Sequence, residues 1–367
     1  MRYTFDSREV RPGMGFVALK GEKADGHDFI PQALAAGAAD VIDGLDELQR
    51  RARERRRALK AKVVGLTGSA GKTTTKEFLK AFLACPGTEG NFNNHIGLPL
   101  TILNCPDDAD FLVLEMGTNH PGEIKALCDI AEPGVGVIAS IGTAHIEFFG
   151  TQEGIAEEKG TLFASTKDFN VVSSSCNQLD VLRRLSNPRL IEVDVSSGGL
   201  ECPLPGAHNL SNMMLAYATA RELGVTHGEC AARLGDFALP GARWRVSEKW
   251  GATFIDDTYN ANPDSMIAAL DAFAATPCDG RRIAVLGDMF ELGDRSLELH
   301  KMVFGHAMSL GIPLVIGVGE MSSQCLCHLV YKSVAALKKR FRVDVSAGDL
   351  VLIKASHAMR LGDLLAD

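Results

Sequence analysis

One stretch in the first third of the chain decides the predicted fold: Gly65-Leu66-Thr67-Gly68-Ser69-Ala70-Gly71-Lys72-Thr73-Thr74-Thr75. It follows an apolar segment at 62–67 that is typical of a buried strand, and it opens a helix-forming segment at 73–84. A glycine-rich turn between a strand and a helix is the structural context of a phosphate-binding loop. The strict G-x-x-x-x-G-K-T spacing is not met, because Leu66 holds the first glycine position and Gly68 serves instead. The stretch still predicts a site for a nucleoside triphosphate.

The residue types in this loop suit phosphate. The glycines let successive backbone N–H groups turn toward phosphate oxygens, and the helix N-terminus adds a partial positive charge. Lys72 brings a full positive charge to the β- and γ-phosphates, and the Thr73 hydroxyl is a ligand for Mg²⁺. The predicted nucleotide-binding residues of the loop are Gly68, Ser69, Ala70, Gly71, Lys72, Thr73 and Thr74.

Outside this loop, short apolar segments alternate with helix-forming segments. The apolar segments at 110–115 and 135–141 are continuous rather than alternating, which is typical of buried parallel strands. After the breaker Pro240-Gly241 the alternation restarts. The strands predicted there lie at 253–257, 282–287, 314–317 and 350–354.

This pattern predicts an α/β protein built from more than one domain. A chain of 367 residues has room for two to three domains at about 150 residues each. We expect a central phosphate-loop domain with a parallel sheet over 62–240 and a C-terminal α/β domain over 241–367. Residues 1–61 form a shorter first block.

Composition excludes some classes of protein. With 38 Lys and Arg against 46 Asp and Glu, the net charge of −8 gives no general attraction for nucleic acid or an anionic membrane. No apolar run reaches the length of a membrane helix, and no secretory signal is visible, so we expect no membrane insertion and a cytoplasmic location. The nine cysteines then read as free thiols. The basic run Arg50–Arg57 reads as a solvated helix face, with a nucleic-acid arm as the alternative.

Three polar residues outside the loop are candidates for chemistry. Glu115 ends a predicted strand that should lie beside the phosphate loop, where a carboxylate could bind Mg²⁺ or else cap a helix. His145 follows another strand end, where a structural role is the alternative to a ligand role. Lys159 reads from its local sequence as an exposed helical lysine.

Further motifs follow one another in a distinctive order. They are Asp6-Ser7-Arg8-Glu9-Val10-Arg11-Pro12-Gly13 and Asp25-Gly26-His27-Asp28-Phe29 in the first block, Asn91-Phe92-Asn93-Asn94-His95-Ile96-Gly97, Leu114-Glu115-Met116-Gly117-Thr118-Asn119-His120-Pro121-Gly122-Glu123-Ile124 and Leu204-Pro205-Gly206-Ala207-His208-Asn209 in the centre, and Asp256-Asp257-Thr258-Tyr259-Asn260-Ala261-Asn262-Pro263 and Leu286-Gly287-Asp288-Met289 in the last block. With these motifs the sequence resembles the Mur ligases, ATP-dependent amide-forming enzymes of peptidoglycan precursor synthesis. The N-F-N-N-H-I-G and E-M-G-T-N-H-P-G-E-I segments are most similar to the MurF-type members.

The resemblance implies a fold and a reaction. It implies three domains: a reduced UDP-substrate-binding domain over 1–61, the central ATP-binding domain and a Rossmann-like C-terminal domain. It implies that ATP phosphorylates the terminal carboxylate of UDP-N-acetylmuramoyl tripeptide and that the amine of D-Ala-D-Ala attacks the acyl phosphate. The two substrates are then the expected partners, and we expect a monomer. The sequence does not identify the third amino acid of the tripeptide.

The resemblance also implies roles in the nucleotide and metal sites. Thr73 and Glu115 would hold one Mg²⁺, and His145 with Glu115 would hold a second. Lys159 matches a lysine that family members carbamylate with CO₂, which turns a cation into a metal-orienting anion. The other implied ATP-site residues are Asn212 and Asn209 at adenine, Asp257 at the ribose, and Arg243, in preference to Arg245, at the γ-phosphate.

For the other substrates, the resemblance implies that Asn94 and His95 approach the carboxylate that is activated. For Asn260 and Asn262 a local turn role is the alternative. Lys354-Ala355-Ser356-His357 stands where K-G-S-R is usual in the family, and a histidine offers the dipeptide carboxylate a weaker, pH-dependent charge. The full set of implied substrate-binding residues is Ser7, Arg8, Gly26, His27, Asp28, Asn260, Asn262 and Lys354.

Two other functions stay open at this point. One is a related Mur or folylpolyglutamate-type ligase with a different acceptor. The other is a non-catalytic nucleotide-binding relative, which the presence of Lys72, Thr73, Glu115, His145 and Lys159 together disfavours.

Overall fold

The computed structural model describes residues 1–21, 24–197, 199–235 and 237–366, and these fall into two compact units. The first unit comprises Met1–Ser140, Ala156–Gly198 and Asn212–Gly235, and the second comprises Ile141–Ile155, Gly199–Ser211 and Asp236–Asp367. The chain therefore passes between the units more than once. Helices α7 (Gln152–Ser165) and α9 (Ala207–Glu222) contain residues of both units.

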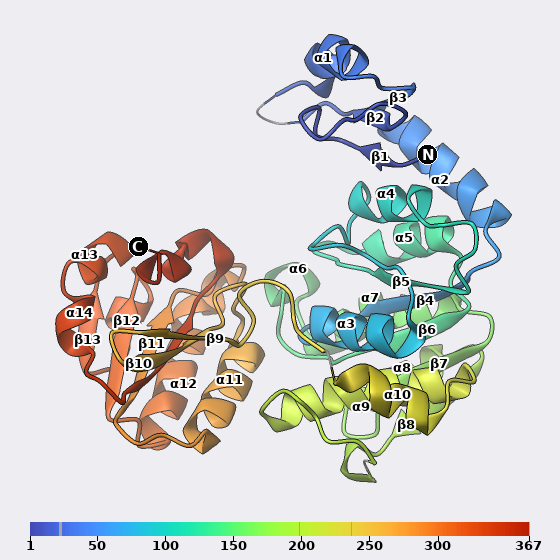
Figure 1. Ribbon diagram of the computed structural model, residues 1–367. Helices are drawn as coiled ribbons and strands as arrows, with labels where there is room; N and C mark the ends of the chain where they lie inside the picture. The colour runs from blue at the N-terminus through green and yellow to red at the C-terminus, as the bar shows by residue number, and fades with distance from the viewer. Residues whose placement is uncertain (22–23, 198, 236, 367) are drawn as a thin grey trace. The chain divides into compact units, whose positions relative to one another are not determined.

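A five-stranded parallel sheet forms the centre of the first unit (Figure 1). Its strands are β4 (Lys62–Thr67), β5 (Phe111–Glu115), β6 (Val135–Ile138), β7 (Phe169–Ser173) and β8 (Arg189–Val193). Their order is β5-β4-β6-β7-β8, so the chain leaves β4 toward one neighbour and later returns on its other side. Ligand sites in open parallel sheets lie beyond the carboxyl ends of the strands at such a switch point. The phosphate loop follows β4 at that end.

Helices cover both faces of this sheet. On one face α3 (Lys72–Leu83) packs against β5 and α10 (His227–Leu234), while α4 (Gly97–Leu103) and α5 (Glu123–Ala131) lie on the other (Figure 1). The short helix α8 (Leu179–Leu185) connects β7 to β8. Burial on both faces explains why the residues of β4 to β7 are mostly apolar. The strands predicted at 62–67, 110–115 and 135–141 are confirmed to within three residues.

A small sheet precedes the central one. Strands β1 (Tyr3–Thr4), β2 (Gly15–Ala18) and β3 (Asp40–Asp43) pair in parallel in that order, and α1 (Ile30–Ala35) covers them over a small core that contains Phe16 and Ala33. The Tyr3 main chain exchanges two hydrogen bonds, of 2.7 and 2.9 Å, with the side-chain amide of Asn104. This exchange fastens β1 to the end of α4. The long helix α2 (Gly44–Ala58) then leads to β4 and packs on α4 and α5.

The basic run lies on α2, and its interpretation as a solvated face is wrong for two of its residues. Arg56 donates from Nε to the carbonyl of Ala131 at 2.7 Å and from Nη2 to that of Glu132 at 3.3 Å. Arg55 donates to the carbonyl of Cys105 at 2.6 Å. The last carbonyls of a helix lack partners and carry partial negative charge, which explains why guanidinium groups bind there. The run therefore fastens α2 to the ends of α4 and α5.

Replacing Arg56 by Ala is expected to lower the free energy of unfolding by about 1–3 kcal/mol, because two partly buried carbonyls lose this donor. Burial lowers the pKa of Arg56. Arg50→Ala is the matched control on the same helix. Arg50 is exposed and pairs with Glu54 and Glu47 at the surface, so its removal should change stability by less than about 0.5 kcal/mol. Urea unfolding of both variants checks this. Equal effects would contradict the fastening role.

A six-stranded sheet forms the second unit (Figure 1). In the order β13-β12-β11-β14-β10-β9, all strands are parallel except β9, which pairs antiparallel with β10 at the edge. The strands are β9 (Arg245–Lys249), β10 (Ala252–Asp256), β11 (Arg282–Gly287), β12 (Leu314–Val318), β13 (Leu329–Tyr331) and β14 (Leu350–Lys354). The strands predicted at 253–257, 282–287, 314–317 and 350–354 are confirmed to within one residue, whereas β9 and β13 were not predicted.

Alternating side chains of these strands fill two cores, one on each face. Ile255, Leu286 and Leu352 pack with α11 (Pro263–Ala275) and α12 (Ser296–Ser309). Phe254, Val285 and their neighbours pack on the other face with α13 (Val334–Lys338) and α14 (Phe341–Asp344). Helices on both faces of a mostly parallel sheet confirm the predicted α/β class.

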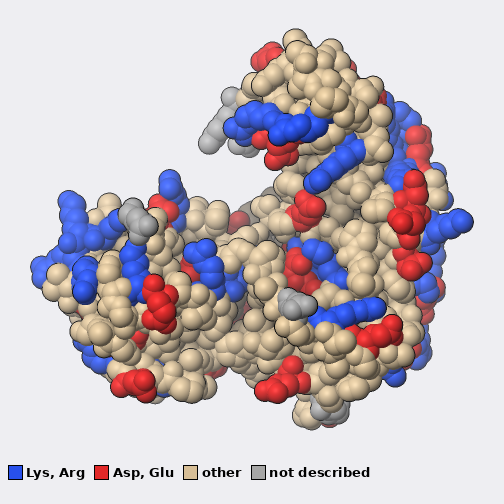
Figure 2. Space-filling model, viewed as in Figure 1, with Lys and Arg blue, Asp and Glu red and all other residues tan. Residues whose placement is uncertain are grey.

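Surface and composition add three facts. Positive and negative side chains are interspersed with uncharged surface on the face shown in Figure 2. All nine cysteines are free thiols. Within the described residues, no helix combines the length and the apolar composition that crossing a bilayer requires.

Candidate active site

The phosphate loop is held against the end of β6. Ser69 N–H donates to the carbonyl of Ser140 at 2.9 Å, and Ala70 N–H donates to its hydroxyl at 3.0 Å. Lys72 Nζ donates to the carbonyl of Gly68 at 2.6 Å, so its ammonium folds back over the loop. These bonds place the predicted phosphate-binding residues in one turn at the switch point of the sheet.

Gly71 caps α3 and must be glycine for two reasons. Its φ of +79° lies in the left-handed region, and a Cβ at this position would lie 2.3 Å from Oδ1 of Asn212. Asn212 is buried and accepts a hydrogen bond from the Thr75 hydroxyl at 3.3 Å. Asn212 therefore packs directly against the loop, where adenine recognition by this residue was predicted.

Replacing Gly71 by Ala is expected to weaken ADP binding at least about tenfold, because the methyl group must displace Asn212 and tilt the loop. Gly122→Ala is a matched control: Gly122 also caps a helix, at φ +89°, but a Cβ added there would have no atom within 4 Å. Calorimetric titration with ADP separates the two. Similar losses in both variants would assign the effect to backbone strain alone.

The Glu115 carboxylate lies beside this loop and is buried, with 2% of the residue exposed. Oε2 accepts from the Thr73 hydroxyl at 3.0 Å, and Oε1 accepts from Nδ2 of Asn93 at 2.8 Å. Lys76 Nζ lies 3.4 Å from the same Oε2. Glu115 therefore links the loop to the segment around Asn93.

The donor set fits Mg²⁺ rather than a transition metal. Among the described residues, no three His, Cys, Asp or Glu side chains come together as a metal-binding cluster. A hydroxyl and a carboxylate are nevertheless together at the phosphate loop, at Thr73 and Glu115. Mg²⁺ at nucleotide sites takes few protein ligands and completes its shell with phosphate oxygens and water.

Lys159 is buried on α7, with 1% of the residue exposed, so its interpretation as a surface lysine is wrong. Burial lowers the pKa of its amine well below the usual range, and the positive charge of Lys72 lowers it further. The neighbouring Glu158 turns away and caps α5, accepting from Gly122 N–H at 2.8 Å and Ile124 N–H at 2.9 Å. A lowered pKa increases the fraction of unprotonated amine, which is the nucleophilic form.

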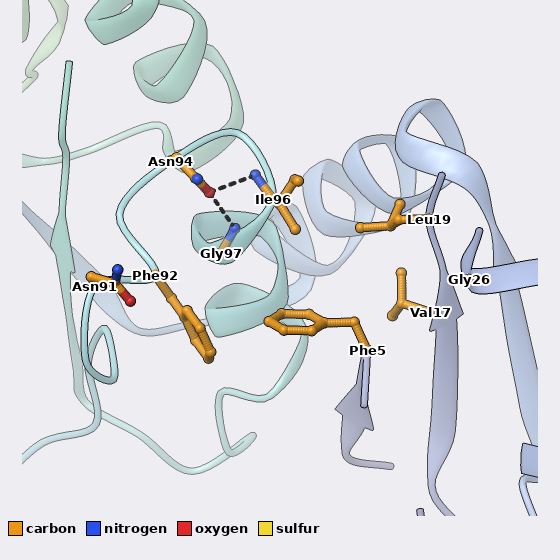
Figure 3. A pocket seen from close by; sticks show the side chains of 9 residues that line it. All are labelled: Phe5, Val17, Leu19, Gly26, Asn91, Phe92, Asn94, Ile96 and Gly97. Carbon is orange, nitrogen blue, oxygen red and sulfur yellow. Dashed lines mark hydrogen bonds between the residues drawn. The ribbon is translucent and has the colours of Figure 1, made fainter. Parts of the chain in front are cut away.

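A cavity of about 370 Å³ lies between the small sheet and the segment 91–97 (Figure 3). The rings of Phe5 and Phe92 meet edge to face, with centroids 5.2 Å apart. Asn94 borders the cavity, and its Oδ1 accepts from the N–H groups of Ile96 and Gly97, as Figure 3 shows. The complete lining is Phe5, Val17, Leu19, Gly26, Asn91, Phe92, Asn94, Ile96 and Gly97.

Of the substrate residues predicted in the first block, Gly26 alone appears in that lining. Ser7 is buried and donates to Gln32 at 3.1 Å, and Arg8 pairs with Asp6 at the surface. His27 lies between the carboxylates of Asp25 and Asp43, which raise its pKa. Asp28 and His95 are exposed and lie outside the lining.

In the second unit, the buried Lys354 forms an ion pair with the partly buried Asp257. Lys354 Nζ lies 2.6 Å from Oδ2 of Asp257 and donates to the carbonyl of Asn260 at 3.0 Å. Asn262 caps α11, with its Oδ1 accepting from Ser265 N–H. The Asn260 side chain accepts from Ala261 N–H at 2.9 Å. Both asparagines thus make local bonds in this structure, their substrate-binding role stays a prediction, and Lys354 supports Asp257.

The remaining predicted residues of the second unit are Arg243, His145 and Asn209. The guanidinium of Arg243 stacks on Tyr259, 3.3 Å from the ring centroid, whereas Arg245 pairs with the buried Asp256 at 3.1 Å. His145 has φ +61°, and its Nδ1 lies 2.9 Å from a carboxylate oxygen of Glu291. Asn209 is buried and donates to the carbonyl of Pro205 at 2.7 Å.

Comparisons with known proteins agree with this geometry. Models of the Mur ligase family catalytic domain, the Mur ligase middle domain and the Mur ligase glutamate ligase domain match residues 2–66, 66–196 and 242–357. The UDP-N-acetylmuramoyl-tripeptide–D-alanyl-D-alanine ligase of Bacillus subtilis is 33% identical over 99% of this chain and 92% of its own. The chain belongs to the Mur ligase family. The corresponding Escherichia coli ligase is 34% identical over the same shares.

Solved structures place this Mur ligase among the MurF folds. Crystal structure I of MurF from Acinetobacter baumannii superposes with a TM-score of 0.89 at 28% identity, over 100% of this chain and 92% of that one. MurF from Thermotoga maritima in complex with ADP gives a TM-score of 0.84 at 32% identity, over 99% and 96%. The expected family and its three-domain α/β architecture are confirmed.

Four residues of this Mur ligase were missed as site residues: Asn93, Lys76, Phe5 and Phe92. Asn93 and Phe92 stand inside the N-F-N-N-H-I-G motif, which pointed to the right segment but not to these side chains. Lys76 follows Lys72 by four residues, and this spacing places both on one helix face. That spacing was the available signal. Phe5 had none, because its contact with Phe92 joins distant parts of the chain.

Proposed function

We propose that this chain is an ATP-dependent ligase that joins D-Ala-D-Ala to UDP-N-acetylmuramoyl tripeptide, a step of peptidoglycan precursor synthesis. The observation that carries the proposal is the buried Glu115 carboxylate, held by Thr73 and Asn93 beside a phosphate loop. That arrangement stands in a chain at least 33% identical to two ligases named for this reaction.

The reaction has two balanced steps. A carboxylate oxygen of the tripeptide attacks the γ-phosphorus of ATP, the bond to ADP breaks, and an acyl phosphate forms. The amine of D-Ala-D-Ala then attacks the acyl carbon, loses a proton, and the tetrahedral intermediate expels inorganic phosphate. A carboxylate is a poor electrophile, and the phosphate provides the leaving group that amide formation needs.

The residues of this chain counter the charges that meet in these steps. Lys72 and the N-terminus of α3 neutralise the β- and γ-phosphates. We assign Arg243 to the γ-phosphate; without nucleotide its guanidinium stacks on the ring of Tyr259. Asn212 and Asn209 face adenine, and Asp257, fixed by Lys354, accepts from the ribose hydroxyls.

Thr73 and Glu115 would hold Mg²⁺ on the phosphates, and His145 with Glu115 would hold a second ion that the carbamate of Lys159 would orient. The ions supply positive charge where negative oxygens approach one another. Lys159 serves as a carbamate: its neutral amine attacks CO₂, a C–N bond forms and a proton is lost. The burial of Lys159 supports this modification, because only the unprotonated amine reacts.

The cavity beside Phe92 and Asn94 receives part of the UDP-muramoyl substrate, with Asn94 and His95 on the segment that approaches the tripeptide carboxylate. We assign the three functions to three segments. Residues 1–61 bind the UDP-substrate, 62–240 bind ATP, and 241–367 complete the nucleotide site. The enzyme acts as a monomer.

Phosphate release with different acceptors tests this function. With ATP, Mg²⁺ and UDP-N-acetylmuramoyl tripeptide, D-Ala-D-Ala should accelerate phosphate release, whereas D-Ala, L-Lys and L-Glu should not. Release that needs L-Glu or L-Lys instead would indicate a related ligase with another acceptor. If no acceptor increases phosphate release at any concentration, the protein binds nucleotide without having this ligase activity.

A further inference from the structure

Lys76 is a buried cation that the proposed reaction does not use. It lies on α3, one turn after Lys72, and none of its side chain is exposed. Its Nζ donates to the carbonyl of Gly90 at 3.2 Å. The same atom lies 3.4 Å from Oε2 of Glu115 and 3.3 Å from Oε1 of Glu77. A buried ammonium must be paired, and here one of its partners is the predicted metal ligand.

The charged groups around Lys76 compensate one another. Glu77 also pairs with Lys80, at 2.9 Å. Negative Glu115, positive Lys76, negative Glu77 and positive Lys80 thus form an alternating row with no net charge. The Glu115 carboxylate is therefore neutralised, oriented by Thr73 and Asn93, and withdrawn from water before any ligand arrives.

We propose that Lys76 is a positioning residue that makes divalent-cation binding at Glu115 depend on nucleotide. A free divalent cation that approaches Glu115 meets a carboxylate whose charge Lys76 already balances, and it is repelled by the ammonium. The triphosphate brings the additional negative charge that outweighs this repulsion. The cation thus enters with ATP and not before it. This inference rests on the proposed function, because it takes Glu115 as the metal ligand.

The same ammonium fixes the segment that borders the cavity. Lys76 holds Gly90, and three residues later Asn93 holds the other oxygen of Glu115. The main chain of Asn93 also accepts from Gly117 N–H at 2.8 Å, directly after β5. Lys76 and Asn93 therefore contact different oxygens of Glu115 and fix residues 90–93 relative to it. Removing the ammonium should loosen the segment that carries Phe92 and Asn94.

Binding of Mn²⁺, followed by electron paramagnetic resonance of the free ion, tests the inference. The full-length wild-type protein should bind Mn²⁺ tightly with a non-hydrolysable ATP analogue and weakly without it. Without nucleotide, Lys76→Met should bind Mn²⁺ at least about tenfold more tightly than the wild type, since Glu115 loses its counter-charge. Lys76→Gln should behave like Lys76→Met, and Lys76→Arg should restore weak binding. Lys80→Met is the matched control and should match the wild type, because Lys80 does not contact Glu115.

Hydrogen exchange adds a readout of position. Amides of residues 89–97 should exchange faster in Lys76→Met than in Lys80→Met, while amides of β4 stay protected in both. Unchanged exchange in this segment would overturn the claim that Lys76 fixes it.

Each metal-binding outcome assigns a cause. Tight Mn²⁺ binding by the wild type without nucleotide overturns the inference, and this result needs no variant to fold. Binding by Lys76→Met that is no tighter than that of the wild type overturns it as well. No Mn²⁺ binding by the wild type even with the ATP analogue would instead count against Glu115 as a metal ligand, and so against the proposed function.

Discussion

Lys72→Ala is expected to lower kcat for dipeptide-dependent phosphate release by about 10³-fold. The Lys72 ammonium lies over the phosphate loop, bonded to the carbonyl of Gly68, and it is the full positive charge that this loop itself offers to the phosphates. Charge develops on the γ-phosphate oxygens during transfer, so Lys72 stabilises the transition state more than it stabilises bound ATP. Its removal should therefore raise mainly the energy of the transition state. Steady-state kinetics will measure kcat, and calorimetric titration will measure the affinity for ADP. The loss in kcat should exceed the loss in affinity.

Lys80→Ala is the control for this variant. Lys80 lies on the same helix and is partly exposed, and it contacts Glu77 rather than the loop. Its removal should leave kcat within about threefold of the wild type. A Lys72→Ala enzyme that keeps more than a tenth of the wild-type kcat would show that another group supplies the charge.

Lys159→Ala is expected to lower kcat by about 10²- to 10³-fold, with little change in nucleotide affinity. The side chain is buried on α7, and burial together with the charge of Lys72 lowers the pKa of its amine, which favours the unprotonated form that reacts with CO₂. Truncation would remove the proposed carbamate and leave a cavity. A short carboxylate such as propionate should enter that cavity and restore part of the activity, because it returns the anion without the covalent bond.

Lys167→Ala is the matched control, because Lys167 follows α7 and is exposed, 3.8 Å from Glu132. It should keep wild-type activity with and without added carboxylate. Intact-protein mass spectra of the wild type should show an added 44 Da that is lost on acidification and absent from Lys159→Ala. If no carboxylate restores Lys159→Ala and this mass is never seen, the lysine acts as a plain amine.

The parts of the fold that were predictable are those written in local sequence. Buried parallel strands such as β4 and β11 have continuous apolar sequences. The glycine-rich sequence after β4 predicts a tight turn between a strand and a helix. Lys72 and Thr73 could be placed because their positions in the loop determine what they face. Weakly apolar edge strands such as β9, with exposed Arg245 and Val246, carry no such pattern and were missed.

The parts that were not predictable depend on contacts between distant residues. Lys159 reads as an exposed lysine until the packing of α7 buries it. Arg56 reads as a solvated charge until α2 meets the end of α5. Asn93 became identifiable as a partner of Glu115 only when β5 and the segment after Gly90 were placed side by side. In each case the local sequence gives the residue type, and the tertiary partner decides its role.

Oxygen-isotope transfer tests the central claim, amide formation through an acyl phosphate, most directly. UDP-N-acetylmuramoyl tripeptide with ¹⁸O in its terminal carboxylate is incubated with the enzyme, ATP, Mg²⁺ and D-Ala-D-Ala, and both products are weighed by mass spectrometry. One ¹⁸O atom should appear in the released phosphate for every amide formed, and one should stay in the amide carbonyl. Unlabelled phosphate, or labelled phosphate without the pentapeptide product, would contradict the proposed reaction.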